Sequence, residues 1–255
     1  IRDRPGAISV ADGATGRPVD PYRLENYSLN TLTSTPQRAS DVNFTATGNA
    51  RRDFLWSVPF TLRTGLDFRQ SSRDSRQWTS TYTYVGPDGR QNTTLGTATR
   101  FLDPLFSTRF GPYGFPQIQY PDNKEVFAYW RTHPGEFTLD ENNLYRSGVT
   151  NSKFAREAVS AAYLRGDVAL LDRRLQLVGG MRAEQTNIKA QGPLTDLTLN
   201  VQRDAQGRPL RNAAGAIIPI TTDALATSKL TFLERAAFAK KEYLRLFPSL
   251  NATYQ

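Results

Sequence analysis

The chain has 255 residues, a formal net charge of +8, 38% hydrophobic residues and a mean hydropathy of −0.52. It has no run of 18 apolar residues, so a transmembrane helix is excluded, whereas membrane-spanning β-strands of about 9 to 11 alternating residues are not. The absence of cysteine excludes disulfides and thiolate metal sites, and one histidine makes imidazole ligation of a metal unexpected. The basic residues are scattered along the chain, so we expect no nucleic-acid partner.

The N-terminal residues 1–38 are rich in proline, glycine, aspartate and arginine, which predicts a loop with one short strand around 27–33. A β-hairpin is expected next, at about 41–69. From Val42 to Phe68 the even positions are mostly apolar and the odd positions mostly polar. This period-2 pattern predicts strands with one apolar and one polar face.

The turn of this first hairpin is predicted at 51–53, which holds two arginines and an aspartate. With that turn, Ala50 pairs with Phe54, and all even positions stay on one face. Leu55 and Pro59 interrupt the alternation, and a proline within a strand would require a bulge.

A long polar segment follows at about 70–153, with several turn signals and at most a short strand near 78–85. Its aromatic residues could line a ligand-binding vestibule by stacking, as aromatic side chains do in concave sites. The residues expected to bind ligand are Phe110, Tyr113, Phe115, Tyr120, Tyr129 and Trp130. The alternative is that these side chains hold the loop together.

The most regular stretch is a second hairpin at about 156–188. If Leu170 faces Leu175 across the four-residue turn 171–174, one face of both strands is apolar or small throughout. The other face collects charged residues such as Arg165 and Glu184. A second long segment, about 189–246, then contains a turn-rich part and a possible helix at 231–247, and the alternation returns at 248–255.

This order gives five strands that are joined alternately by turns of three or four residues and by segments of about 50 to 80 residues. Such long structureless connections are uncommon in compact soluble domains. They are normal in bacterial outer-membrane barrels, which have short periplasmic turns and longer extracellular loops. We therefore predict an all-β fold, an antiparallel transmembrane β-barrel segment, with long loops at about 1–38, 70–153 and 189–246.

In this interpretation the apolar face meets lipid and the polar face encloses a polar lumen. Phe54 and Trp56, just beyond the predicted turn, would belong to an aromatic girdle at the periplasmic interface. The alternative for the charged face is a solvated cross-strand network without a further role. The charged residues expected to face the lumen are Arg63, Asp67, Arg165, Asp167, Arg182 and Glu184.

Two segments carry a resemblance to a known family. The segment 161–186 ends in a strand with Gly179, Gly180, Met181, Arg182, Ala183 and Glu184, and the segment 242–255 contains Phe247, Pro248, Ser249, Leu250 and Asn251. Together they resemble strands of the β-barrel of TonB-dependent outer-membrane receptors. The matching residues are about 45 of the 255.

The resemblance implies active uptake of a scarce ligand, such as a siderophore, cobalamin or an oligosaccharide, across the outer membrane of a Gram-negative cell. Receptors of this family have an N-terminal plug and a segment that contacts the energy-coupling TonB complex. Neither is recognisable in this chain, so we expect it to be a piece of a longer protein in contact with outer-membrane lipid. No functional residue of the family can be transferred, because those motifs have no counterpart here.

No catalytic motif of the common hydrolase, protease or nucleotide-binding types occurs, so we expect no enzyme activity, no catalytic residue, no metal and no cofactor. The main alternative is a soluble, secreted all-β carbohydrate-binding module. Its hairpins would pack their apolar faces against each other. Burial of Phe44, Trp56, Phe60 and Met181 beneath a second protein layer would favour that alternative.

Overall fold

The computed structural model describes residues 8–13, 15–90, 96–111 and 114–254. These residues are mostly antiparallel β-sheet, with 53% in strands, so the all-β prediction is confirmed. They form two compact units, one from residues up to 34 together with 79–144, the other from 35–78 together with 145 onward.

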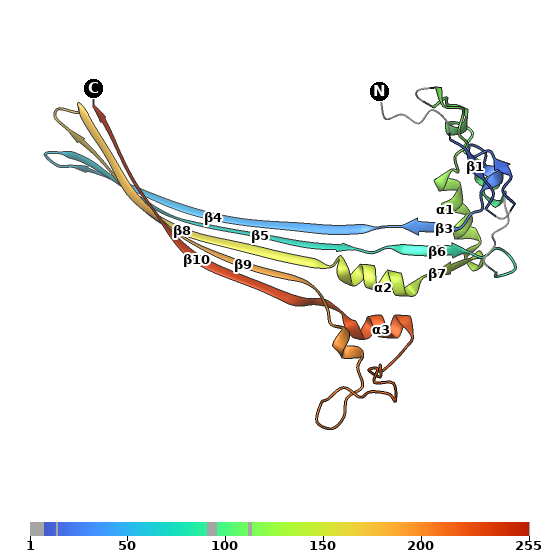
Figure 1. The fold of residues 1–255 in the computed structure, drawn as a ribbon. Coiled ribbons are helices and arrows are strands. Elements are labelled where there is room, and N and C mark those ends of the chain that lie inside the picture. Colours follow the sequence, from blue (N-terminus) through green and yellow to red (C-terminus); the bar gives the residue numbers. More distant parts are fainter. Residues whose placement is uncertain (1–7, 14, 91–95, 112–113, 255) are drawn as a thin grey trace. The chain divides into compact units, whose positions relative to one another are not determined.

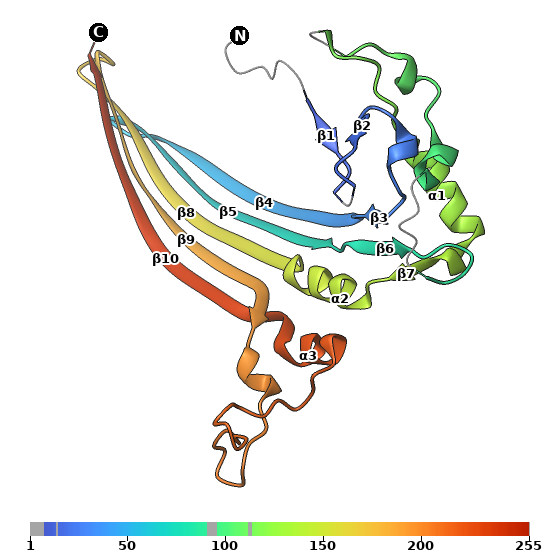
Figure 2. The same cartoon turned by 45° about the vertical axis from the view of Figure 1, so that its right-hand side comes forward.

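The second unit is built on a single five-stranded antiparallel sheet, whose long strands lie side by side in Figures 1 and 2. Each strand is hydrogen-bonded to the next strand of this sheet along the chain, so the order is β4-β5-β8-β9-β10. The strands are β4 (Gln37–Leu55), β5 (Pro59–Gln77), β8 (Lys153–Leu170), β9 (Leu175–Thr195) and β10 (Phe232–Tyr254). The sheet is thus a meander, and within the described residues these five strands form one layer.

The hairpin of β8 and β9 has the predicted register. Leu170 pairs with Leu175, and Leu164 with Met181. The turn between them contains three successive non-glycine residues with positive φ, Leu171 at 53°, Asp172 at 52° and Arg173 at 71°. A left-handed turn matches the right-handed twist of the two strands, which accounts for this backbone conformation.

The hairpin of β4 and β5 differs from prediction in the place of its turn. Leu55 pairs with Pro59, so the turn consists of Trp56, Ser57 and Val58, and the predicted turn 51–53 lies inside β4. The predicted mid-strand proline instead begins β5. Since both turns have three residues, even positions still pair with even positions, and the division into two faces is unchanged.

The predicted helix at 231–247 is wrong, because nearly all of this segment belongs to β10. Its even positions from Leu244 onward are mostly apolar. From Leu246 to Tyr254 these positions pair with apolar or small residues of β9, from Ala183 to Leu175. A β-bulge interrupts the pairing between Leu233 and Ala237, and Arg235 within it has a φ of 54°. The bulge marks the loop end of the sheet.

Short helices flank the sheet at this end. They are α2 (Glu141–Thr150), η6 (Leu197–Asn200) and α3 (Ala224–Thr231). The side chain of Asp223 accepts a hydrogen bond from the backbone N–H of Ala226 at 2.7 Å and so caps α3. The C-terminal residue of α3, Thr231, is buried, and its hydroxyl donates to the carbonyl of Thr227.

The first unit is more ordered than the loops predicted for 1–38 and 70–153. Its main sheet is β3 (Thr31–Ser34), β6 (Ser80–Tyr84) and β7 (Phe137–Leu139), in the order β3-β6-β7. Its other elements are β1 (Val10–Ala11), β2 (Pro18–Val19), η1 (Leu24–Asn26), η2 (Thr97–Phe101), η3 (Phe106–Thr108), α1 (Asn123–Thr132) and η5 (Pro134–Glu136). A small core holds them together, formed by Leu24, Tyr84, Val85, Ala98, Phe101, Val126 and Phe137.

Candidate functional site

One face of the five-stranded sheet is apolar near the hairpin turns. Cross-strand rows on this face include Leu246, Ala183, Ala162, Leu66 and Gly48, and, nearer the turns, Ala252, Leu177, Val168, Phe60 and Phe54. No other described element of the second unit covers this face as a second layer. Phe44, Trp56 and Met181 remain 56%, 66% and 50% exposed, and Phe60 is half-buried beside the rings of Phe54 and Trp56.

Aromatic side chains gather at the turn end of the apolar face. The rings of Trp56 and Phe60 are stacked with centroids 6.3 Å apart, and Phe54 lies 4.9 Å from Trp56. Arg52, a cation on the same face, has its guanidinium 5.2 Å from the Phe54 ring, so its charge lies toward the turn. At the other end of the apolar face, Phe44 and Phe68 are in contact at 5.9 Å.

The opposite face carries all six charged residues predicted to share it, in two groups. In the group nearer the turns, the Asp167 carboxylate accepts from Arg165 Nη2 at 2.6 Å and lies 3.8 Å from Arg63 Nε. Arg63 and Arg165 are direct cross-strand partners. The shared carboxylate therefore offsets the repulsion between two adjacent cations.

The second group lies farther along the same strands. Arg182 Nη2 donates to Glu184 Oε2 at 3.0 Å and lies 3.4 Å from Asp67 Oδ2, and Arg69 lies 3.5 Å from the same aspartate. The group thus joins β5 and β9 across β8. Its charges alternate in sign from row to row, so it forms a connected ion-pair network.

The sequence prediction missed polar partners on this face. Tyr163 donates from its hydroxyl to Asn49 Oδ1 at 2.9 Å, and the side chains pass over the buried Gly65. Asp53 accepts from Arg51 Nη2 at 2.9 Å and from the Thr61 hydroxyl at 2.6 Å. Strict alternation would have placed Arg51 and Asp53 on this face, had the turn not been assigned to them.

The predicted ligand-binding aromatics of the first unit lie in different environments. Tyr129 and Trp130 are half-buried and serve the packing of α1, with Trp130 5.0 Å from the Tyr82 ring. Phe115 is half-buried as well. Tyr113 lies outside the described residues. Phe110 and Tyr120 are exposed, Phe110 to 80%.

Phe110 and Tyr120 line one groove of about 570 Å³. Phe106 joins them, with its ring 6.4 Å from that of Tyr120 and the Arg109 guanidinium 4.3 Å from its centroid. The remaining lining residues are Asp103, Arg109, Gly111, Ile118, Pro121, Asp122, Asn123 and Lys124. The groove combines exposed rings with charges of both signs, which suits a ligand with a flat or apolar part and polar groups.

Glu136 organises the interior of the first unit. Its Oε2 accepts from the Tyr129 hydroxyl at 2.6 Å and from the Tyr84 hydroxyl at 3.3 Å. Burial, followed by the hydrogen bond to Glu136, raises the pKa of Tyr129 to about 12, and burial also raises the pKa of Tyr84. The Arg100 guanidinium lies 4.4 Å from the Tyr129 ring. These groups stabilise the fold around α1.

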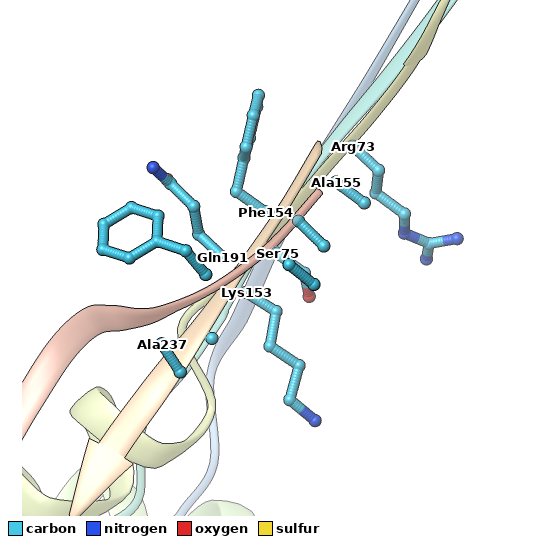
Figure 3. Close-up of a pocket in the computed structure, with 11 residues that line it drawn as sticks. Arg73, Ser75, Lys153, Phe154, Ala155, Gln191 and Ala237 are labelled. Carbon is cyan, nitrogen blue, oxygen red and sulfur yellow. The ribbon is translucent and has the colours of Figure 1, made fainter. Parts of the chain in front are cut away.

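A hollow of about 590 Å³ lies at the loop end of the large sheet. Figure 3 shows that Phe154 and Gln191 project to one side of the sheet, whereas Arg73 and Lys153 project to the other. Its remaining lining residues are Ser75, Ala155, Ala190, Gly192, Ala237, Phe238 and Ala239. Because the lining comes from both faces, the hollow is not one enclosed chamber, and we do not assign it a ligand.

None of the helices in the described part of the chain combines the length and apolar character that a bilayer crossing requires. The same residues contain no group of three or more His, Cys, Asp or Glu side chains arranged to hold a metal ion. The two candidate sites are the charged face of the sheet and the aromatic groove of the first unit.

A scan of the sequence against models of known protein families found no match, and a search of curated proteins found none either.

Proposed function

We propose that this chain forms part of the β-barrel of a TonB-dependent outer-membrane receptor, which takes up a scarce ligand such as a siderophore, cobalamin or an oligosaccharide. One observation carries the proposal. The five-stranded sheet has an exposed apolar face without a covering layer among the described residues of its own unit, and a charged, ion-paired face on its other side. This is the reverse of a soluble protein, where the apolar face is buried.

The height of the apolar band supports a membrane location. On β10 the band runs from Leu244 to Tyr254, and on β5 from Phe60 to Phe68. The ten steps from Leu244 to Tyr254, at about 3.3 Å each, extend about 33 Å along the strand. At a strand tilt of about 40° this length crosses about 25 Å of a bilayer. Outer-membrane barrels have an apolar band of this height between aromatic girdles.

The pairing of β9 with β10 supports the family. The two segments that resemble TonB-dependent receptors are direct hydrogen-bonded neighbours, with Gly180 opposite Ser249 and Arg182 opposite Phe247. Two separate stretches of sequence thus join in one structural unit, as they would in a barrel wall.

In this proposal the charged face borders the lumen and the plug, and the groove around Phe106, Phe110 and Tyr120 belongs to the ligand-binding loops. The energy-coupling TonB complex would be the partner that supplies energy for uptake. A soluble carbohydrate-binding module would require a partner layer over Phe44, Trp56 and Met181, and the exposure of these side chains favours the membrane receptor.

The test begins with the full-length gene product in its own cells. We expect it in the outer-membrane fraction after carbonate extraction, with a heat-dependent shift of its migration on a denaturing gel, as folded barrels show. Deletion of the gene should abolish growth on one limiting nutrient, screened across iron chelates, cobalamin and oligosaccharides. Recovery of the protein in the aqueous phase after membranes are pelleted would refute the proposal.

A further inference from the structure

Three cations lie side by side on the apolar face, one row beyond the apolar band toward the loops. Arg156 on β8 pairs with Lys189 on β9, and Lys189 pairs with Lys240 on β10. The side chains of direct cross-strand partners are about 5 Å apart at Cβ, where like charges repel. All three residues are exposed.

The counter-charges of this row are incomplete. Lys240 Nζ lies 2.7 Å from Glu242 Oε1, a hydrogen bond that lowers the pKa of the glutamate. Among the described residues, neither Arg156 nor Lys189 has a carboxylate within ion-pair distance, and Lys189 acts on Glu242 only through its charge, which also lowers the pKa of that glutamate. The nearest acid of the next row, Asp74, is already bound by Arg235.

The opposite face of the same sheet shows the contrast. There Arg51, Arg63 and Arg165 also form a cross-strand row, but each lies within 3.8 Å of Asp53 or Asp167. The protein therefore compensates a row of cations with its own carboxylates on one face and leaves a similar row largely uncompensated on the other.

The position of the row indicates the source of the missing anion. Two residues closer to the turns lies the row of Glu242, Asn187, Ala158, Gln70 and Phe44, and then the apolar rows begin. On the loop side Phe154 follows, projecting to the same side as Gln191 (Figure 3). The cations thus stand at the edge of the band where, in the proposed membrane location, lipid headgroups begin.

We propose that Arg156, Lys189 and Lys240 bind the phosphate groups of an anionic lipid in the membrane leaflet on the loop side. This inference rests on the proposed membrane function. Arginine offers a planar fork to phosphate oxygens and lysine a point charge, so the row suits a headgroup with more than one phosphate. The acyl chains would lie along the apolar rows of β8, β9 and β10.

The experiment uses the full-length protein extracted from membranes in mild detergent and delipidated. Bis-phosphorylated lipid A is titrated against it, and the bound lipid is counted by native mass spectrometry. The test variant combines Arg156→Gln, Lys189→Gln and Lys240→Gln. The matched control removes three charges from the other face at the same end of the sheet, with Arg73→Gln, Lys153→Gln and Lys241→Gln.

We expect the test variant to bind the lipid at least tenfold more weakly, since each cation near a membrane surface contributes about fivefold in affinity. The control should stay within about twofold of the wild type. Dephosphorylated lipid A should bind the wild type at least tenfold more weakly than the phosphorylated form.

Equal lipid binding by the test variant and the wild type would overturn the inference. So would inorganic phosphate that displaces the lipid completely at millimolar concentration, because the site would then be one for the free anion. Membrane fractionation of the wild type distinguishes the failure of this inference from the failure of the proposed function. If the wild type pellets with membranes and the test variant still binds lipid A normally, only the lipid-binding inference is refuted.

Discussion

Arg235 on β10 binds the carboxylate of Asp74 on β5, 161 residues earlier in the chain and three strands away in the sheet. Its Nη1 donates to Asp74 Oδ2 at 3.0 Å, its Nη2 donates to Oδ1, and its Nε donates to the Ser152 hydroxyl at 2.9 Å. The hydrogen bond from Arg235 holds the pKa of Asp74 below its usual value. The positive φ of Arg235 in the β-bulge gives the side chain this direction.

We predict that this pair couples the strands energetically. In a double-mutant cycle with Arg235→Ala and Asp74→Ala, the coupling free energy should be about 1 to 2 kcal/mol, because the bond is bidentate and partly buried. The measurement is the free energy of urea unfolding of the full-length protein in detergent. The exposed pair Arg73 and Asp41, 3.7 Å apart, is the control and should couple by less than about 0.5 kcal/mol. Equal coupling in both pairs would contradict the prediction.

Gly65 lies beneath the hydrogen bond between Tyr163 and Asn49. A Cβ at this position would clash with the Asn49 side chain and would lie 2.6 Å from Tyr163 Cε1. We predict that Gly65→Ala displaces the ring and costs about 1 to 3 kcal/mol of unfolding free energy. Gly48→Ala is the matched control, since a Cβ there meets open space, and it should change stability by less than about 0.5 kcal/mol. A cost shared equally by the two variants would show that the covering ring is unimportant.

Leu250 and Ser249 are adjacent in β10 and point to opposite faces of the sheet, both exposed. If the apolar face meets lipid, Leu250→Arg should cost about 2 to 4 kcal/mol, whereas Ser249→Arg on the charged face should cost less than about 1 kcal/mol. The measurement is folding into lipid vesicles, followed by urea unfolding. In water the exposed Leu250 would tolerate arginine, so a small effect for both variants would indicate a soluble protein.

Phe110 and Phe101 separate ligand binding from folding in the first unit. Phe110 is exposed, and Phe110→Ala should leave the unfolding free energy within about 0.5 kcal/mol while it lowers ligand-dependent growth or uptake. Phe101, only 4% exposed, belongs to the core, so Phe101→Ala should cost about 3 to 5 kcal/mol. Protease susceptibility and uptake are measured together. Normal uptake by the Phe110 variant would remove the groove as a ligand site.

The raised pKa of Tyr129 predicts a dependence of the first unit on alkaline pH. The folded protein holds the hydroxyl proton more tightly than the unfolded chain, whose tyrosines titrate near pH 10. The stabilisation is therefore complete below about pH 10. It is lost as the pH rises toward the folded pKa of about 12. Near-UV circular dichroism should decline over this range, and Tyr129→Phe should shift or flatten the decline; an unchanged curve would contradict the assignment.

The hairpin of β8 and β9 could be predicted in detail because the alternation of its strands and the composition of its turn agree. Its two strands alternate without interruption, and a turn with an even number of residues, such as the four between Leu170 and Leu175, keeps Leu164 and Met181 on the same face. The charged residues of its polar face follow from the same parity. Their ion pairs with Arg63 and Asp67 of the first hairpin could not be foreseen, because the alignment of β5 with β8 depends on contacts about 100 residues apart.

The first hairpin shows where turn chemistry misleads. Arg51, Arg52 and Asp53 have the polar composition expected of a turn in water. The actual turn contains Trp56 and Val58, which are exposed apolar residues. The alternation could not reveal this, because three-residue turns at 51–53 and at 56–58 both keep the even positions on one face. The error moved the turn by five residues but preserved the faces.

The ordered first unit was not visible in the sequence because its contacts join distant segments. The backbone N–H of Leu24 donates to Gln119 Oε1 at 2.8 Å, 95 residues later, and Tyr84 packs against Phe137. Local periodicity is short in such a unit, so pattern analysis classifies it as loop. Only the short strands expected around 27–33 and 78–85 left a local signal, and they overlap β3 and β6.

The outer sides of β4 and β10 have no strand partner among the described residues, over strands of 19 and 23 residues. Backbone N–H and C=O groups along these two strand edges would lack hydrogen-bond partners in the hydrocarbon of a membrane. Additional strands would have to pair with both edges for the sheet to lie there. In aqueous buffer, the unpaired edge strands of two copies would pair with each other and cause aggregation. When this chain is expressed alone, strands that pair with β4 and β10 should therefore be added as separate polypeptides. Precipitation without them would reflect the unpaired strand edges.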